Sequence, residues 1–453
     1  MNRMEYNSII EKIFESGKDS LEDMEVFIEN GKEIEIDVFE GELNKYNIAE
    51  SGGLSLRGIS NGKMGYSYTE KIDESSIDLI INDVIENSKY IDSPDKEEIF
   101  SGSSKYEEVD LYNENLSQVS LEKKIDFVKA LEKEALSLDE RVVSVSGCSY
   151  GEVEQHRILQ NTKGVDLEEK KNIAYCYISV VVKENEDIKT GSSYIISNDF
   201  SDYDYKSLAK EAVEEGLSML GAKSIESGNY PIIFRNDVFA NILETFVPVF
   251  SAENVQKGLS LLKDRIDSEI ASPILTLSDD PFIKDGVASR AFDDEGMATK
   301  FKKVIDKGTL KTYFYNWKTA KKDRVSSTGN GYRGSYKSSL SIAPTNLYVE
   351  SGKDSFEDLI KSIDHGLLII DVQGLHSGAN AVSGDYSLSA YGYEIEGGKI
   401  KRPVNQITIA GNFYDTLKNI EKIGNDLKFV LPGMGGQVGS PSVKVKSLSV
   451  SGE

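Results

Sequence analysis

Residues 374–412 read GLHSGANAVSGDYSLSAYGYEIEGGKIKRPVNQITIAGN, and this stretch decides the fold of the C-terminal half. Its frequent glycines favour positive φ angles or a backbone that passes close to another surface. Between the glycines apolar and polar residues alternate, and Ile395 and Ile400 flank a sequence typical of a tight hairpin. We expect a compact antiparallel sheet preceded by an irregular, glycine-lined loop. Composition alone favours a loop-rich β region here over a ligand site.

The composition is that of a globular protein with an acidic surface. The 453 residues carry a net charge of −24, and 39% of them are hydrophobic. Such a surface repels phosphate backbones, so we expect no binding to nucleic acid and none to a membrane. The longest apolar run, around 174–182, falls well short of the ~20 residues of a membrane helix. With no secretory signal and two cysteines outside any zinc pattern, a cytoplasmic location with free, buried thiols is expected.

Hydrophobic periodicity divides the N-terminal half into two units of similar order, each with a helix, antiparallel strands and a second helix. In the first unit we expect helices over 4–16 and 74–90 around strands over 32–39 and 46–59. In the second we expect helices around 121–131 and 208–220, with strands over 141–146, 157–160 and 174–183. The polar stretch 91–115 is typical of a linker or a long loop.

The predicted fold class is therefore α+β. Two small helix-plus-antiparallel-sheet units, 1–92 and 116–222, precede a larger β-rich, barrel-like antiparallel domain over 226–453. The main boundary falls in the turn-rich segment 221–231.

Several short motifs match catalytic or ligand-binding patterns but lack the required context. The G-x-S-x-G match at 147–151 continues as a strand, whereas a nucleophile elbow needs a helix there. The G-x-G-x-x-G match at 329–334 is followed by a β-like stretch, so we expect no nucleotide cradle. The carboxylate clusters at 279–281 and 292–296 could ligate a hard cation, but solvated turns are the favoured interpretation.

The order of longer motifs is similar to that of a known family. The C-terminal motifs are FSAENVQKGLS (250–260), SRAFDDEG (289–296), KGTLKTYFYN (307–316), STGNGYR (327–333), TNLYVESG (345–352), GLHSGANAVSGDYS (374–387), ITIAGN (407–412) and IGNDL (423–427). SGGLSLRG (51–58) and NTKGVDL (161–167) extend the match toward the N-terminus. The sequence resembles the TldD/PmbA family, often labelled modulators of DNA gyrase, over nearly the whole chain.

That resemblance implies one of two roles. The TldD branch carries an H-E-x-x-x-H helix and a C-terminal cysteine that bind zinc, whereas the PmbA branch, also called TldE, lacks them and pairs with the first. Here the corresponding helix reads NILETFVPVF (241–250), and the segment after IGNDL reads KFVLPGMGGQVGS (428–440). Neither contains histidine or cysteine, and catalytic zinc needs three protein ligands. The chain thus resembles the PmbA/TldE branch, with no cofactor of its own and zinc expected only in a TldD-like partner.

The implied function is that of a non-metal-binding subunit in a zinc metallopeptidase that processes or degrades peptides and small unfolded proteins. The expected partners are a TldD-like chain, a second copy of this chain, or both, in a dimer. We expect no catalytic and no metal-binding residue in this chain. The candidate residues for contact with substrate or partner are Thr328, Gly329, Asn330, Gly331, His376 and Asp385.

Two alternatives stay open at this point. The chain could be a freestanding hydrolase with a relocated site at His376 and Asp385. It could also be a binding or regulatory protein, of the gyrase-modulator type, without proteolysis. As a lone histidine, His376 is more often structural than functional.

Overall fold

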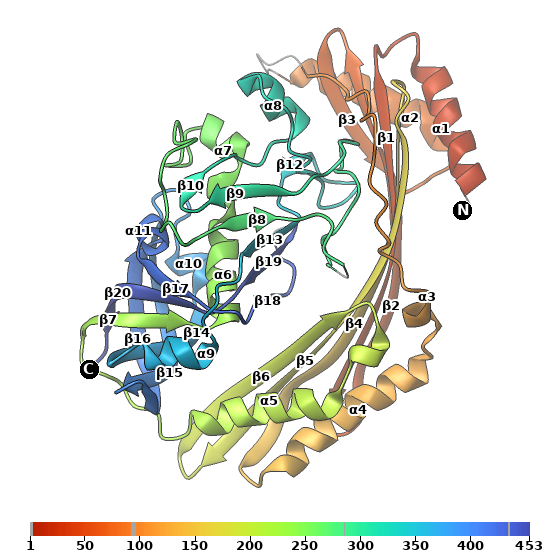
Figure 1. The fold of residues 1–453 in the computed structure, drawn as a ribbon. Coiled ribbons are helices and arrows are strands. Elements are labelled where there is room, and N and C mark those ends of the chain that lie inside the picture. The colour runs from red at the N-terminus through yellow and green to blue at the C-terminus, as the bar shows by residue number, and fades with distance from the viewer. Residues whose placement is uncertain (1–2, 92–96, 285, 434) are drawn as a thin grey trace.

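The computed structural model describes residues 3–91, 97–284, 286–433 and 435–453. A long, curved sheet from the N-terminal half stands on one side, and the C-terminal half faces its concave surface (Figure 1). Within these residues, no helix combines the length and the apolar character needed to cross a membrane. The predicted α+β class and the barrel-like C-terminal domain are both confirmed.

The long sheet has six antiparallel strands in the order β3-β2-β1-β4-β5-β6. Their bounds are β1 Met24–Phe39, β2 Glu42–Ser60, β3 Lys63–Thr69, β4 Val142–Asn161, β5 Asp166–Glu184 and β6 Asp187–Ser197. Each predicted unit contributes three of them, and β1 pairs with β4 where the two units meet. One continuous sheet therefore contains strands of both N-terminal units. The unit limits stay predictions: 1–92, 116–222 and 226–453.

The helices of the N-terminal half lie on the convex face of this sheet (Figure 1). They are α1 Arg3–Gly17, η1 Glu74–Ser76, α2 Ile77–Tyr90, α3 Glu114–Gln118, α4 Leu121–Leu138, η2 Phe200–Asp202 and α5 Tyr205–Ser218. Two separate apolar cores lie beneath them, one under α1 and α2 and the other under α4 and α5. Because side chains alternate along a strand, the residues between these core positions point to the concave face. Both cysteines are free and buried, as predicted.

The C-terminal half contains a closed five-stranded barrel in the order β16-β15-β14-β7-β20, in which β20 pairs back onto β16. The strands are β7 Gly228–Phe234, β14 His365–Gln373, β15 Asp385–Glu396, β16 Lys399–Asn412 and β20 Val443–Ser451, with β17 Ile420–Ile423 beside β20. The predicted hairpin after Ile395 joins β15 to β16. The short helix α10 (Leu375–Gly378) lies in the predicted glycine-lined loop.

A second six-stranded sheet, β10-β9-β8-β13-β19-β18, completes this half. Its strands are β8 Leu277–Asp279, β9 Lys302–Asp306, β10 Thr309–Leu310, β13 Asn346–Val349, β18 Lys428–Phe429 and β19 Gln437–Ser440. The other elements are α6 Asn236–Phe246, η3 Val247–Phe250, α7 Ala252–Gln256, α8 Trp317–Asp323, β11 Gly331–Tyr332, β12 Ser341–Ile342, α9 Phe356–Lys361 and α11 Phe413–Lys418. The apolar helix α6 packs in the core that both sheets share.

The predicted linker 91–115 is a packed segment over much of its length. Residues 92–96 lie outside the described residues, and 97–113 contain no helix or strand. Ile99 and Phe100 are buried, and the Tyr106 hydroxyl donates to the carbonyl of Gly296 at 2.8 Å. The segment therefore runs between the long sheet and the C-terminal half and contacts the latter.

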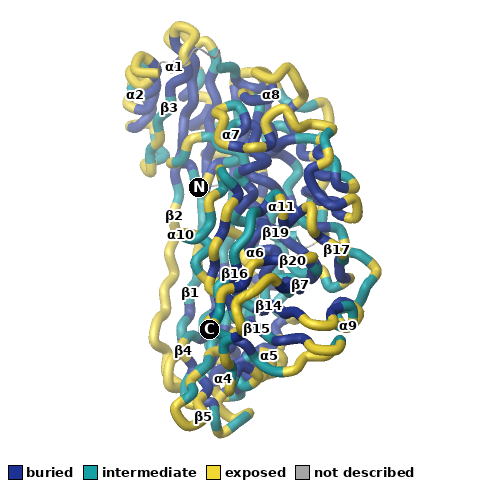
Figure 2. The backbone as a smooth tube through the Cα atoms, turned by 90° about the vertical axis from the view of Figure 1, so that its left-hand side faces the viewer, coloured by how far each residue is buried: buried dark blue, intermediate teal, exposed yellow. Residues whose placement is uncertain are grey.

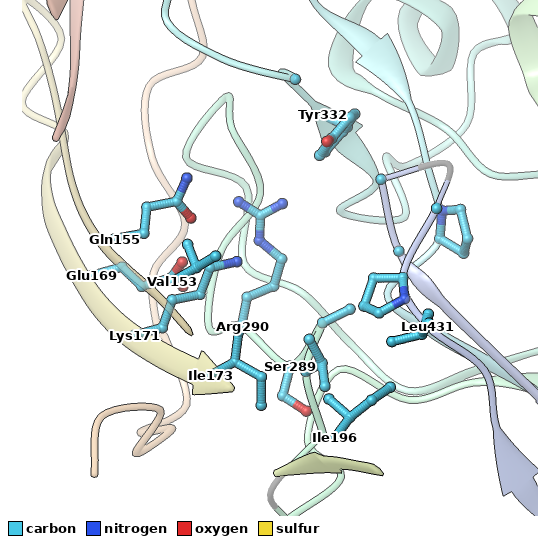
Figure 3. Close-up of a pocket in the computed structure, with 18 of the residues that line it drawn as sticks. Val153, Gln155, Glu169, Lys171, Ile173, Ile196, Ser289, Arg290, Tyr332 and Leu431 are labelled. Atoms are coloured by element: carbon cyan, nitrogen blue, oxygen red, sulfur yellow. The ribbon is translucent and has the colours of Figure 1, made fainter. Parts of the chain in front are cut away.

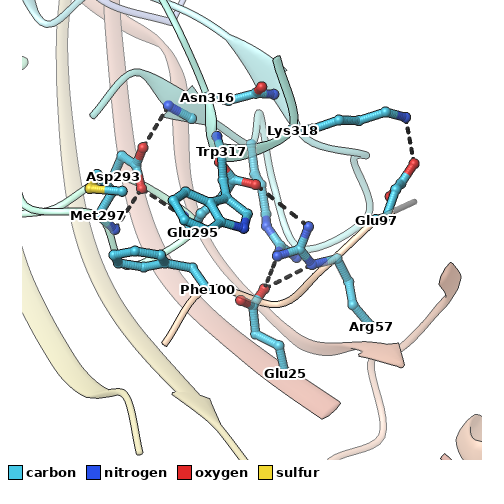
Figure 4. Close-up of polar contacts among 12 residues, drawn as sticks. Glu25, Arg57, Glu97, Phe100, Asp293, Glu295, Met297, Asn316, Trp317 and Lys318 are labelled. Atoms are coloured by element: carbon cyan, nitrogen blue, oxygen red, sulfur yellow. Dashed lines mark hydrogen bonds and ion pairs between the residues drawn. The ribbon is translucent and has the colours of Figure 1, made fainter. Parts of the chain in front are cut away.

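A network of buried charges joins the long sheet to the C-terminal half (Figure 4). Arg333, which exposes 0% of its surface, bonds Glu25 of β1 and donates to the Ser55 hydroxyl at 3.2 Å. Its guanidinium also lies 5.0 Å from the centroid of the Phe27 ring, a cation–π contact. Arg57 of β2 donates to Glu25 at 2.9 Å. The polar residues on the concave face of the sheet are thus partners of the C-terminal half.

The prediction that the carboxylate clusters form solvated turns is wrong. Asp279, Asp293, Asp294 and Glu295 are all buried. Asp279 accepts from Lys302 at 2.6 Å, and Glu295 accepts the backbone N–H of Trp317 at 2.6 Å. Sequence composition suggested exposure because carboxylates are seldom buried unless they are paired, and apart from Arg290 their cationic partners lie 20 or more residues away along the chain. Within the described residues, no group of three or more His, Cys, Asp or Glu side chains is arranged to hold a metal ion.

Replacing Arg333 should separate the sheet from the C-terminal half. We expect R333M to lower the free energy of unfolding by about 3 kcal/mol or more, because the substitution leaves the buried Glu25 without one of its cations. The matched control is K337M, which removes a solvent-exposed ion pair with Glu70 and should cost far less than R333M, because water screens such pairs. Urea denaturation followed by fluorescence measures the free energy of unfolding of both variants. Equal losses in R333M and K337M would contradict the structural role of Arg333.

Candidate functional site

A cavity of about 590 Å³ lies between the concave face of the long sheet and the C-terminal half. Its volume is in the range of sites that hold a ligand of several hundred daltons. Figure 3 shows side chains from the two halves pointing toward one another across it. The long sheet contributes Val153, Gln155, Arg157, Glu169, Lys171, Ile173, Tyr175 and Ile196.

The floor of the cavity is a series of cross-strand pairs of β4 and β5. Arg157 lies opposite Glu169, Gln155 opposite Lys171, and Val153 opposite Ile173. Successive pairs are two residues apart, so about 7 Å separates them along the strands. The floor therefore grades from a charged pair through a polar pair to an apolar pair.

The opposite wall comes from loops of the C-terminal half. It consists of Val287, Ala288, Ser289, Arg290, Tyr332, Gly334, Pro344, Leu431, Pro432, Gly433, Gly435 and Gly436. Gly435 has a φ of +91°, and a Cβ atom there would lie 2.5 Å from the Tyr332 ring. Only glycine fits this position, because the backbone both adopts a left-handed conformation and touches an aromatic ring.

Two arginines at the charged end of the cavity are held by buried carboxylates. Arg157 donates to Glu29 at 3.0 Å and lies 3.5 Å from Asp294. Arg290 bonds the same Asp294 carboxylate. Burial alone would raise the pKa of Asp294, but the guanidinium groups of Arg290 and Arg157 outweigh it and lower that pKa to about 2. Asp294 is therefore ionised at neutral pH and fixes both arginines.

Lys171 and Glu169 in the same cavity are less completely paired. Burial, together with the nearby Arg157, lowers the pKa of Lys171 to about 8. Glu169 exposes 8% of its surface, and its Oε2 atom makes no hydrogen bond to any described residue. Unpaired buried oxygens of this kind are uncommon in native proteins and call for an explanation.

A second cavity, of about 430 Å³, adjoins the first and shares Tyr332, Gly433 and Gly435 with it. Val247 and Pro248, directly after α6, form part of its wall. Asn241, Glu244 and Thr245 are half-buried polar residues in the second half of α6 and lie on one face of the helix. A Cβ atom on Gly433 would lie 2.7 Å from the Glu244 carboxylate, so α6 faces the loop 430–436 directly.

The structure thus brings α6 and the loop after Leu427 together. By resemblance, these two segments correspond to the ones that bind zinc in the TldD branch. Their donors do not fit catalytic zinc. The helix face offers an amide, one carboxylate and a hydroxyl, and the segments 236–250 and 428–440 contain no histidine or cysteine. Three nitrogen, sulfur or carboxylate ligands are needed for such a site. We therefore derive no reaction step through a metal in this chain.

The predicted contact residues 328–331 are buried, and their hydrogen bonds lie within the C-terminal half. The Thr328 hydroxyl donates to the Tyr315 carbonyl at 3.1 Å. Asn330 donates to the carbonyl of Ala343 at 2.9 Å, and the N–H of Gly331 donates to Asp293 at 2.8 Å. The next residue, Tyr332, reaches both cavities. A role of residues 328–331 in contact with substrate or partner stays a prediction.

His376 and Asp385 lie elsewhere and are exposed, His376 in α10 and Asp385 at the first position of β15. Asp385 accepts from the Asn412 side chain at 2.9 Å, which lowers its pKa. No hydrogen bond joins His376 to Asp385 among the described residues, and neither lines the two cavities described above. His365 lies 3.4 Å from Glu394, against the Tyr230 ring.

Sequence reasoning missed the charged floor of the first cavity. Arg157, Glu169 and Lys171 alternate with outward-facing residues in strands that look like ordinary amphipathic strands. One signal was available: the stretches EVEQHR (152–157) and EEKKN (168–172) carry charged or polar residues at successive positions, so both faces of the strands are polar. Because helices cover one face of these strands, the polar residues on the other face must contact solvent, a ligand or a polar surface of the chain.

Three family models match successive parts of the chain. They are the PmbA/TldA metallopeptidase domain 1 over residues 24–88, the central domain over 114–220 and the C-terminal domain over 227–452. In Buchnera aphidicola subsp. Acyrthosiphon pisum, a protein named metalloprotease PmbA homolog is 27% identical over 89% of this chain and 88% of its own length. A metalloprotease TldD homolog of the same organism is 28% identical over 90% and 88%.

Two crystal structures are similar throughout. A Thermotoga maritima protein described as a candidate modulator of DNA gyrase has a TM-score of 0.91 and 32% identity, over 98% of this chain and 100% of its own. TldE from Thermococcus kodakarensis shares the fold, with a TM-score of 0.88 and 24% identity over 98% and 100%. The fold and these matches define a class of peptidase-related proteins. The chain belongs to the TldD/PmbA family.

The Lys171 ammonium should lose its proton at an unusually low pH for a lysine. With a pKa of about 8, it loses its proton at a pH where an ordinary lysine, with a pKa near 10.4, remains charged. NMR of ¹³C-methylated lysine side chains over pH 6–11 measures the midpoint, and the K171R variant assigns the signal by its loss. A Lys171 midpoint near 10.4 would contradict the electrostatic description of the cavity.

Proposed function

We propose that this chain is the PmbA/TldE-like, non-metal-binding subunit of a two-chain zinc peptidase that processes or degrades peptides. The main observation in support is the composition of α6 and the loop facing it, where the donors available do not suit zinc. The chain would contribute the walls of a peptide chamber, and a TldD-like chain would contribute the metal. The paired cavities around Tyr332 support a ligand-binding role for this surface.

An exposed strand edge supports the pairing part of the proposal. In the described part of the chain, β3 pairs with residues 54–60 of β2 and no strand pairs with residues 42–53 on that side, so these form an open edge. Figure 2 shows this part of β2 as an exposed trace along the margin of the molecule. Leu43, Tyr46 and Ile48 are exposed there, although they lie opposite Val38, Ile36 and Ile34 of β1, which belong to or pack against the core under α4 and α5.

An open edge with apolar side chains is a typical site for another strand to pair. Within the chain, β1 and β4 already join two similar units in this way. We propose that residues 42–53 pair with a TldD-like chain, and that this contact covers the apolar row.

The proposed role predicts how metal and activity are distributed. Purified without any partner, the chain should hold less than about a tenth of an equivalent of zinc, because a stable site needs a full ligand set. Peptide cleavage sensitive to chelators should appear only after a TldD-like chain is added. Metal analysis by mass spectrometry and a peptide-cleavage assay measure the two. Chelator-sensitive cleavage by the chain alone would refute the proposal and favour a freestanding hydrolase.

The open edge of β2 makes a second prediction. A lysine in the apolar row, I48K, should weaken association with a TldD-like chain about tenfold or more, which corresponds to ~1.4 kcal/mol. The control N47K adds the same charge to the other face of the strand at a neighbouring exposed position. Light scattering and sedimentation of the mixed chains measure association. If I48K and N47K associate equally well, the edge is not the contact.

A further inference from the structure

Two charged groups in the first cavity are incompletely paired within the chain. Arg157 and Arg290 are each bonded to a buried carboxylate, whereas Lys171 forms no ion pair within 4.0 Å among the described residues. Glu169, two residues earlier on β5, is more than nine-tenths buried and has an Oε2 atom without a hydrogen bond. Both side chains point into the cavity from the same face of the strand (Figure 3). The site thus holds one available cation and one available acceptor.

The neighbouring surface is apolar. The next cross-strand pair beyond Lys171 is Val153 and Ile173, and Leu431 with Pro432 lies on the opposite wall. A ligand that satisfies all three features must carry an anionic group, a hydrogen-bond donor a few ångströms from it, and an apolar group. The last residue of a peptide has all three, since its carboxylate, its amide N–H and its side chain leave one Cα atom.

We propose that this cavity binds the C-terminal residue of a peptide, with its carboxylate on Lys171, its amide N–H on Glu169 and its apolar side chain against Val153 and Ile173. The choice of a peptide as ligand rests on the proposed function. The site itself is a property of this chain alone, and a binding assay without a partner keeps the two ideas separable. Apolar burial then contributes affinity while the charged pair recognises the chain end.

Opposite charges elsewhere in the cavity favour this arrangement over a purely anionic ligand. Arg157 on β4, Arg290 and Asp294 from the loop, and Glu169 on β5 all act on the Lys171 ammonium. Glu29 and Asp294 balance Arg157 and Arg290, so the cation that a bound carboxylate meets is Lys171, with the Glu169 carboxylate beside it. Glu169 would repel a second anionic group placed beside the first. A multiply charged phosphate is therefore a poorer fit than a chain end with a single carboxylate.

The test compares two forms of one peptide on the purified chain without partner. The probe is a fluorescently labelled Ala-Ala-Ala-Leu-Leu, as the free acid or the C-terminal amide, and fluorescence anisotropy at pH 7 gives the Kd. We expect the acid to bind about tenfold tighter or more, a loss of ~1.4 kcal/mol in the amide. K171Q should abolish the preference, and E169Q should weaken both peptides.

The matched control is K170Q, which removes the same charge from the exposed, opposite face of β5 and should keep the preference. Thermal melting of each variant shows that the fold is intact. Equal binding of acid and amide, no binding of either, or a preference that survives K171Q would overturn the proposal. A peptide amide ending in glutamate distinguishes the source of the carboxylate. If it binds as tightly as the free acid, the site reads an acidic side chain and the chain-end assignment is wrong.

The pH dependence gives an independent readout. The acid-over-amide preference should decline as the pH rises above about 8, where Lys171 loses its charge. A bound carboxylate stabilises the ammonium, so the decline in the complex falls at a somewhat higher pH than in the free protein. K171R keeps its charge throughout and should hold the preference to higher pH. A preference of the unmodified chain that is constant from pH 7 to 10 would contradict a role for Lys171.

Discussion

The buried contact of Arg333 with Glu25 is the interaction on which the arrangement of the two halves depends. A guanidinium from the C-terminal half inserts between a carboxylate of β1 and the ring of Phe27, fully removed from water. A buried ion pair contributes little stability by itself, but it penalises every arrangement in which one partner is left alone. We infer that its main effect is to fix the position of the C-terminal half over the concave face.

Buried ion pairs between the two halves continue along the sheet as far as the first cavity. Arg157 and Arg290 meet at Asp294, and Arg157 also bonds Glu29, so two carboxylates balance two guanidinium groups where the halves touch. Further along the strands the pairing is incomplete, and Lys171 and Glu169 face open space instead. A surface that holds the halves together at one end thus becomes a lining for a ligand at the other. The open edge of β2, on the opposite margin of the sheet, leaves room for a second chain.

The local elements of the fold could be predicted from sequence because their signals are local. Ile9, Ile10 and Ile13 mark α1 by helical spacing, and the alternation around Ile395 and Ile400 marks the β15–β16 hairpin. The burial of Asp293, Asp294 and Glu295 could not be predicted in this way. Their partners Arg57, Arg157 and Gly331 lie at distant positions in the chain, and only the tertiary fold brings them together.

The candidate site likewise has features that the sequence predicts and features that only the structure reveals. The absence of histidine and cysteine from 241–250 and 428–440 is visible in the sequence, and so is the resemblance that gives it meaning. The cavity floor is not, because Arg157 and Lys171 are seen as ligand-facing only after the convex face is assigned to the helices. Gly433 and Gly435 are visible in the sequence, but the Glu244 carboxylate and the Tyr332 ring that they approach could only be found in the structure.

Site-specific photo-crosslinking tests the central claim, that this chain lines the peptide chamber of a two-chain peptidase, most directly. A benzophenone amino acid replaces Leu431 in the cavity wall, and another replaces Leu79, which is exposed on the outer helix α2. Each variant is mixed with a TldD-like chain and a labelled peptide substrate and then irradiated. The account predicts labelled peptide attached to the Leu431 variant and none to the Leu79 variant. Equal labelling, or none at Leu431 while the peptide is being cleaved, would contradict it.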